Sequence, residues 1–121
     1  MTRPDDGMTA MPRNFVQPCV LLLLAESPSH GYELLERLGR LGLRRADPGG
    51  LYRTLRALEE QGHVRSWWEQ SAAGPARRTY AITEQGAASL QAWAGSLRDA
   101  HRLLGEVLER YALLSGRNAA P

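Results

Sequence analysis

The stretch DPGGLYRTLRALEEQG at residues 47–62 decides the fold of this 121-residue chain. Asp47 suits an N-cap, because its carboxylate can accept hydrogen bonds from N–H groups that the first helical turn leaves unpaired. Pro48 suits the first helical position, where a missing N–H costs nothing. Gly62 suits the left-handed residue that commonly ends a helix. The stretch therefore predicts one helix with a defined beginning and end.

The two faces of this predicted helix differ in chemistry. Leu51, Leu55 and Leu58 recur at the spacing of a stripe that packs against a core. Arg53 and Arg56 fall on the opposite stripe, which faces solvent. A short helix with leucine on one side and arginine on the other can enter the major groove of DNA. We therefore interpret it as a DNA-recognition helix.

Two strands and a tip of small residues are expected after the recognition helix. Residues 64–69 and 77–82 are rich in β-branched and aromatic side chains, which favour strands. Residues 71–76 between them are Ser, Ala, Gly and Pro and suit a hairpin tip. Apolar segments further upstream predict two more helices, one from about Val16 and one over about 30–41. Three helices followed by a hairpin predict a mainly α fold, a winged helix-turn-helix in which the hairpin is the wing.

The second of these helices is expected to be amphipathic. Ser29 can cap its first turn. The side chains that its spacing predicts to be buried are Tyr32, Leu34, Leu35 and Leu38.

The candidate DNA contacts come from the recognition helix, its approach and the wing. They are His30, Arg44, Arg45, Gly50, Tyr52, Arg53, Arg56, Arg77 and Arg78. Arginine is the commonest reader of guanine and also holds phosphates, and a glycine at a helix N-terminus lets an anion approach the backbone. Other interpretations stay open at this point. They are a solvated face for the helix arginines, packing for Tyr52, a local cap for His30 and an ion pair with Glu69 for one wing arginine.

Positive charge is concentrated on the recognition helix and wing. The net charge of the chain is only +2, but residues 37–78 hold nine arginines against four acidic residues. Residues 16–36 hold three glutamates and no basic residue, and residues 79–121 balance to zero. All fifteen basic residues are arginine, which indicates a GC-rich genome and inflates the arginine count everywhere. The clustering remains, and it is the pattern expected of a surface that contacts phosphates.

A long final helix is expected from Thr83, which can cap it, to about Leu114. Apolar residues recur along it at heptad spacing, which is typical of a coiled-coil seam. The seam can pack on the first helix of the same chain or on the same helix of a second copy, and a symmetric dimer satisfies both. The residues predicted to form the dimer interface are Leu21, Leu24, Leu90, Trp93, Leu97, Leu104, Val107, Leu108 and Tyr111.

Length and composition predict one domain with an added helix. We expect a disordered tail at 1–13, a winged helix-turn-helix at 14–82, a dimerisation helix at 83–115 and a disordered tail at 116–121. The start of the chain does not resemble a signal peptide, and its longest apolar run is too short to span a membrane, so a soluble cytoplasmic protein without a membrane partner is expected.

Catalytic and metal chemistry find no support in the sequence. No His, Cys, Asp or Glu residues stand at metal-ligand spacing, and no catalytic motif is present, so we expect no metal, no cofactor and no enzyme activity. The lone Cys19 excludes an internal disulfide and is interpreted as a small buried hydrophobe.

Four motifs together resemble the PadR family of transcriptional repressors. They are HGYEL at 30–34, GLYRTL at 50–55, LE-x-x-G-x-V at 58–64 and R-x-Y-x-I-T-x-x-G at 78–86. The resemblance covers roughly residues 15–114. It implies a winged-helix homodimer that binds operator DNA and represses a promoter until a ligand or another signal releases it.

Two further segments look like one branch of that family, the polyhydroxybutyrate-responsive repressors. These are residues 14–24, with NF followed by PCVLLLL, and GPARR at 74–78. The length of the final helix is similar to that of the short PadR subfamily. In such dimers the facing terminal helices can enclose an apolar cavity, so Phe15 and Trp93 are candidate contacts for a hydrophobic or aromatic effector. Trp93 fits equally well as plain interface core.

Two other functions remain alternatives. The first is a winged-helix module that binds protein and never touches DNA. The second is a redox sensor that works through Cys19. Charge reversal at Arg53 and Arg56 separates the first from a repressor, and Cys19→Ser tests the second.

Overall fold

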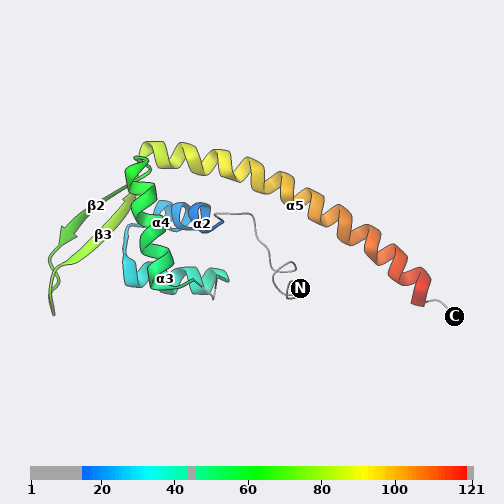
Figure 1. The fold of residues 1–121 in the computed structure, drawn as a ribbon, viewed down its shortest axis with the longest axis horizontal. Coiled ribbons are helices and arrows are strands. Elements are labelled where there is room, and N and C mark those ends of the chain that lie inside the picture. The colour runs from blue at the N-terminus through cyan, green and yellow to red at the C-terminus, as the bar shows by residue number, and fades with distance from the viewer. Residues whose placement is uncertain (1–14, 44–45, 120–121) are drawn as a thin grey trace. The chain divides into compact units, whose positions relative to one another are not determined.

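The computed structural model describes residues 15–43 and 46–119. Its elements in chain order are α2 (Val16–Glu26), β1 (Ser29–His30), α3 (Gly31–Leu41), α4 (Pro48–Glu60), β2 (Val64–Glu69), β3 (Arg77–Ile82) and α5 (Glu84–Ala119) (Figure 1). The chain divides into two units, one up to Leu90 and one from Gln91. The predicted tail at 1–13 lies outside the described residues. The helix α5 continues to Ala119 and so extends past residue 116, where the predicted tail begins.

The core of the first unit is built from leucines of its three helices. The largest fully enclosed side chains are Val20, Leu21, Leu24, Leu34, Leu38, Leu51, Leu55 and Leu58. The stripe predicted for the recognition helix is therefore confirmed, because all three of its leucines belong to this core. Burial of this apolar surface holds α4 in place and leaves its arginine face outward.

The ends of α4 are formed as the sequence predicts. Asp47 is the N-cap, and its Oδ1 accepts a hydrogen bond of 3.1 Å from the N–H of Gly50. Pro48 occupies the first turn. Just beyond the helix, Gly62 has a φ of 79°, a conformation that side-chain-bearing residues rarely adopt.

The sheet has three antiparallel strands in the order β1-β3-β2. β2 and β3 form the predicted hairpin, in register from Val64 opposite Ile82 to Glu69 opposite Arg77. The two-residue β1 pairs with the other edge of β3, with Ser29 opposite Tyr80. The structure therefore adds a strand to the predicted hairpin. It also joins the first turn of α3 to the wing.

Three side chains do not lie where the sequence pattern places them. Leu21 and Leu24 are 0% and 2% exposed in the chain's own core. This burial contradicts their assignment to a dimer interface, because an enclosed side chain leaves no surface for a partner. Tyr32 was predicted to be buried but is 70% exposed. Its position in the first turn of α3 places it outside the stripe formed by Leu34 and Leu38.

The long helix α5 begins at the predicted cap. Thr83 Oγ1 accepts a hydrogen bond of 3.0 Å from the N–H of Gly86 and donates one of 2.6 Å to the carbonyl of Gly62. Within the second unit, the second half of α5 carries a row of exposed apolar side chains. They are Leu103, Leu104, Val107, Leu108, Tyr111, Leu113 and Leu114.

Candidate nucleic-acid interface

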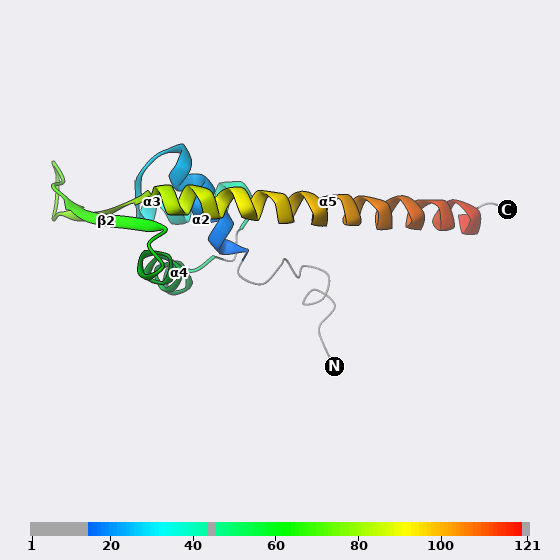
Figure 2. The same ribbon diagram turned by 90° about the horizontal axis from the view of Figure 1, so that it is seen from above.

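The solvent face of α4 carries the two arginines that the sequence places there. Arg53 and Arg56 are both exposed, and neither has an ion-pair partner among the described residues. Figure 2 shows α4 to one side of the hairpin. The recognition helix and the wing belong to the same unit of the chain. Two free guanidinium groups on a helix anchored from behind form a surface suited to base edges or phosphates.

Gly50 has a role that the sequence did not indicate. A Cβ at this position would lie 2.5 Å from Asp47 Oδ1, so a side chain here would require the capping carboxylate to shift. Its N–H already donates to that oxygen. Gly50 therefore serves the N-terminus of the helix, and its N–H is not free to bind a phosphate.

One wing arginine is tied to the recognition helix. Arg78 Nη2 lies 3.7 Å from Glu59 Oε2, and Arg78 Nε donates a hydrogen bond of 2.9 Å to Ser66 Oγ. Ser66 Oγ in turn donates to Glu59 Oε2 at 2.7 Å. We call these three residues the wing clamp, because they join β2 and β3 to α4. The ion pair considered for Glu69 is not formed among the described residues, and its carboxylate instead accepts a hydrogen bond from Thr79 Oγ1.

The other wing arginine meets His30. His30 is the N-cap of α3, and its Nδ1 accepts a hydrogen bond of 3.3 Å from the N–H of Glu33, which confirms the local cap. Its Nε2 lies 3.1 Å from Arg77 Nη1. The cap function expected of Ser29 is thus supplied by the next residue, while Ser29 is buried in β1.

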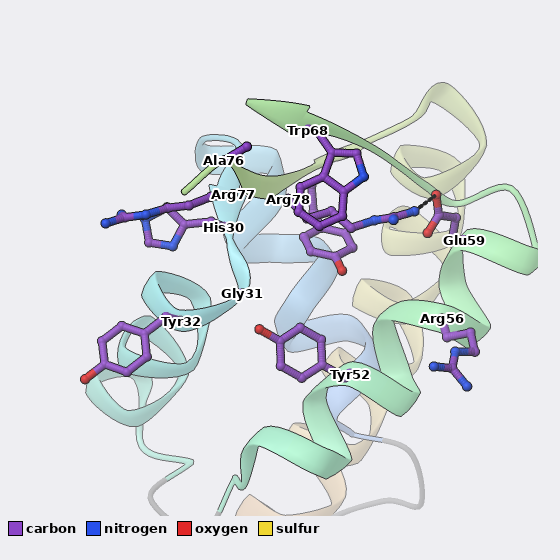
Figure 3. A pocket seen from close by; sticks show the side chains of 11 residues that line it. His30, Gly31, Tyr32, Tyr52, Arg56, Glu59, Trp68, Ala76, Arg77 and Arg78 are labelled. Carbon is purple, nitrogen blue, oxygen red and sulfur yellow. Dashed lines mark hydrogen bonds and ion pairs between the residues drawn. The ribbon is translucent and has the colours of Figure 1, made fainter. Parts of the chain in front are cut away.

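Tyr52 leans from α4 against the start of α3. A Cβ at Gly31 would lie 2.8 Å from Cζ of Tyr52 and still closer to its hydroxyl. The ring can occupy this place only because residue 31 has no side chain. Figure 3 shows the Tyr52 hydroxyl directed toward Gly31.

A hollow of about 800 Å³ lies between α4, the first turn of α3 and the wing. Figure 3 shows Trp68 above it, Tyr52 below it and His30 with Arg77 at one side. Its lining residues are His30, Gly31, Tyr32, Tyr52, Arg56, Glu59, Trp68, Ala76, Arg77, Arg78 and Tyr80. The hollow thus combines aromatic rings with three arginines, and Arg78 lies 5.7 Å from the centre of the Trp68 ring.

Tyr80 is the most deeply placed ring of the hollow, with only 6% of its surface exposed. Burial raises the pKa of its phenol above the ordinary 10.0, and the Arg78 guanidinium opposes part of that rise. The hydroxyl therefore remains protonated, and no hydrogen bond joins it to another described residue.

The sequence found some of this site and missed the rest. It named five of the lining residues as candidate DNA contacts, His30, Tyr52, Arg56, Arg77 and Arg78. It missed the involvement of Glu59, Ser66 and Tyr80. Alternation along β3 indicates which face Tyr80 takes, but nothing local shows that this face turns toward α4. Arg44 and Arg45 lie outside the described residues.

Not every arginine in the basic region serves this surface. Arg37 donates hydrogen bonds of 2.6 Å to the carbonyl of Leu23 and 3.3 Å to that of Ser27, and pairs with Glu26. It therefore satisfies the C-terminal end of α2, where unpaired carbonyls favour a cation.

Two kinds of site are absent from the part of the chain that the structure describes. Among its residues, no three or more His, Cys, Asp or Glu side chains gather in a way that suits a metal ion. No helix in these ranges combines the length and apolar character needed to cross a membrane.

Comparison with known proteins assigns the chain to a family. The model of the transcriptional regulator PadR-like family matches residues 20–92, more than half of the chain. The chain belongs to the PadR family. The family is one of transcriptional regulators.

Individual relatives of this PadR protein agree with the family model. A probable transcriptional regulator of Mycobacterium tuberculosis is 37% identical over 76 residues, which are 61% of this chain and 40% of that protein. The chain thus spans well under two thirds of the curated relative that it matches. The resemblance to that relative extends only to the matched part.

Solved structures show the same fold. A conserved protein of unknown function, called a potential transcriptional factor, is 36% identical with a TM-score of 0.73, over 88% of this chain and 99% of that one. A putative transcriptional regulator from Thermoplasma acidophilum is 28% identical with a TM-score of 0.69, over 78% and 90%. A PadR-like regulator from Bacillus cereus, at 24% identity and a TM-score of 0.71, covers 77% of this chain and 90% of that one. These structures confirm the predicted winged helix-turn-helix with a long final helix.

Proposed function

We propose that this PadR-family regulator is a homodimeric repressor that reads a two-fold operator with α4 in the major groove. The observation that carries the proposal is the outward face of α4. Arg53 and Arg56 are exposed on it without an ion-pair partner in the described ranges, while the leucines behind them are fully enclosed. Arg77 extends this positive surface onto the wing, where it suits the phosphate backbone.

A second copy of the chain is the partner that suits the exposed row on α5. Leu104, Val107, Leu108 and Tyr111 are each more than half exposed, and a single helix cannot cover them. Leu90, Trp93 and Leu97 continue the same heptad pattern toward the start of the helix. A symmetric pair of such helices would set two recognition helices at a fixed separation, as a two-fold operator requires.

We also propose that a small effector releases the protein from DNA. Phe15 and Trp93 remain the residues that the sequence favours for a hydrophobic or aromatic effector. Polyhydroxybutyrate is not supported as the signal, because no relative named above is described as responding to it. An effector would release the operator by binding more tightly to a dimer whose heads do not match the half-site spacing.

The direct test reverses charge on α4. Arg53→Glu combined with Arg56→Glu should abolish operator binding and leave the fold intact, because both side chains are exposed. The matched control is Arg98→Glu with Arg102→Glu, which makes the same charge change at exposed positions of α5 that lie outside the heptad seam.

Gel-shift titration of both variants on DNA from the region upstream of the gene gives the result. Loss of binding in the α4 variant alone supports the proposal. Operator binding retained by both variants would contradict the assignment of DNA reading to α4. Failure of the unmodified protein to bind would favour the protein-interaction alternative.

A further inference from the structure

The hollow between α4 and the wing contains polar groups that the fold does not use. Tyr80 is more than nine-tenths buried, yet its hydroxyl has no hydrogen bond to any described residue. Glu59 makes both of its contacts, to Ser66 and Arg78, through Oε2. Its Oε1 therefore remains an acceptor without a partner in the described part of the chain. Neither atom is sealed from solvent, so both open into the hollow and can bond to a ligand that enters it.

Two hydrogen-bond donors converge at the side of the hollow formed by α3. A neutral imidazole has one nitrogen that accepts and one that donates. Donors nevertheless face both nitrogens of His30, because the N–H of Glu33 lies 3.3 Å from Nδ1 and Arg77 Nη1 lies 3.1 Å from Nε2. Only one of these contacts can be a hydrogen bond to a neutral ring, so one donor is left without an acceptor at the N-terminus of α3. An oxygen of an anion placed there would accept from it, and the helix N-terminus favours the same charge.

Two exposed aromatic side chains also line the hollow. Trp68 is 67% exposed and Tyr52 is 46% exposed, although large aromatic side chains usually bury most of their surface. Both line the hollow, as does Arg56, whose guanidinium is not paired in the described residues. Exposed aromatic faces beside arginine are the chemistry that holds a single base and its phosphate.

We propose that this hollow binds a free mononucleotide, with its base against Trp68 and Tyr52 and its phosphate between His30 and Arg77. A duplex offers phosphates but keeps its bases stacked inside, so operator DNA supplies only half of this chemistry unless a base is flipped out. The Glu59 carboxylate also disfavours a polyanion, whereas Oε1 can accept from an amino group of a base. The volume of about 800 Å³ lies within the range of small-molecule sites.

Nucleotide binding there would exclude the operator. This part rests on the proposed function, because Arg56 and Arg77 are assigned to DNA in that proposal. A phosphate held by Arg77 would neutralise it and repel the phosphates of the duplex. The hollow would thus link the level of a nucleotide to release from the promoter.

The test titrates AMP into the purified protein by calorimetry, without DNA. We expect one AMP per chain, with a Kd on the order of 10 µM, as is usual for ligands of this size. Inorganic phosphate and adenosine, which each supply half of the chemistry, should bind at least about tenfold more weakly.

Three variants locate the site. Trp68→Ala should weaken AMP binding by about tenfold or more, because base stacking on an aromatic ring is lost. Tyr80→Phe removes only the hydroxyl and should weaken it by about two- to tenfold. Arg53→Ala changes the DNA face outside the hollow and should leave AMP binding unchanged.

The outcomes separate this proposal from that of DNA binding. AMP that binds no more tightly than phosphate, or equally well to all three variants, overturns the nucleotide site. AMP that binds as expected but fails to displace operator overturns the regulatory part. AMP binding by a protein with no operator affinity supports the site and contradicts the proposed repressor function.

Discussion

Cys19 shows how the environment of a single residue decides between two functions. It is 5% exposed within α2, and burial raises the pKa of its thiol above the ordinary 9.0. A reactive thiol needs the opposite, a lowered pKa and access to solvent. The structure therefore favours the interpretation of Cys19 as a core residue over the redox sensor.

Thiol labelling measures this directly. At pH 8 the native protein should react with a disulfide reagent about a hundredfold more slowly than the protein in urea, because the thiolate is both scarce and enclosed. Because the folded pKa is raised, the contribution of Cys19 to stability is complete below pH 9.0 and is lost as the pH rises through the folded pKa. Rapid labelling of the native protein would contradict a purely structural role.

At the scale of residues, the sequence predicts those features that depend on residues close by in the chain. The Asp47 cap and the leucine stripe of α4 depend on contacts a few positions away or on helical spacing, and both are found. The partner of Arg78 depends on tertiary structure, because Glu59 is nineteen positions away on another element. The burial of Tyr32 was predicted from helical periodicity alone, and periodicity does not show how far along the helix the core extends.

The wing clamp acts at the scale of elements. Glu59, Ser66 and Arg78 come from α4, β2 and β3 and share two hydrogen bonds and an ion pair. The clamp leaves the Arg78 charge partly neutralised, so its main effect is to position the wing beside the recognition helix. Arg77, which has no acidic partner among the described residues, is the stronger candidate for a phosphate contact.

A double-mutant cycle measures the clamp. Glu59→Gln and Arg78→Gln should show a coupling of about 0.5–1 kcal/mol in urea unfolding, since the side chains are 35% and 44% exposed and solvent screens the pair. The matched control is Glu106 with Arg110, a more exposed pair on α5 that should give about 0.3 kcal/mol. Zero coupling at the clamp would mean that the wing is held by sheet pairing alone.

At the same scale, the number of strands could not be read from the sequence. β2 and β3 have strand-forming residues and a tip between them, so their pairing is local. β1 has two residues, too few for any pattern, and it pairs with β3 about fifty positions away. The hollow depends on that strand, because β1 brings the first turn of α3 to the wing.

The whole molecule is proposed to act as a dimer through α5. Leu104→Glu with Tyr111→Glu places two charges on the exposed apolar row and should convert the dimer to a monomer at micromolar concentration. Operator affinity should then fall by about a hundredfold or more, because each half-site binds alone. Sedimentation velocity measures the oligomeric state. The control variant is Arg102→Glu, which lies outside the seam.

A wild-type protein that sediments as a monomer under the same conditions would contradict this assembly. The exposed row on α5 would then need a different partner.

Recognition of a specific DNA sequence by this PadR-family protein can be measured in solution. Fluorescence anisotropy of the purified protein on duplex from its own upstream region, against a scrambled duplex of equal length, is recorded over a salt series. We expect a preference of about 10³ or more for the natural sequence and an affinity that falls steeply with salt. Equal, weak binding to both duplexes at every salt concentration would contradict it.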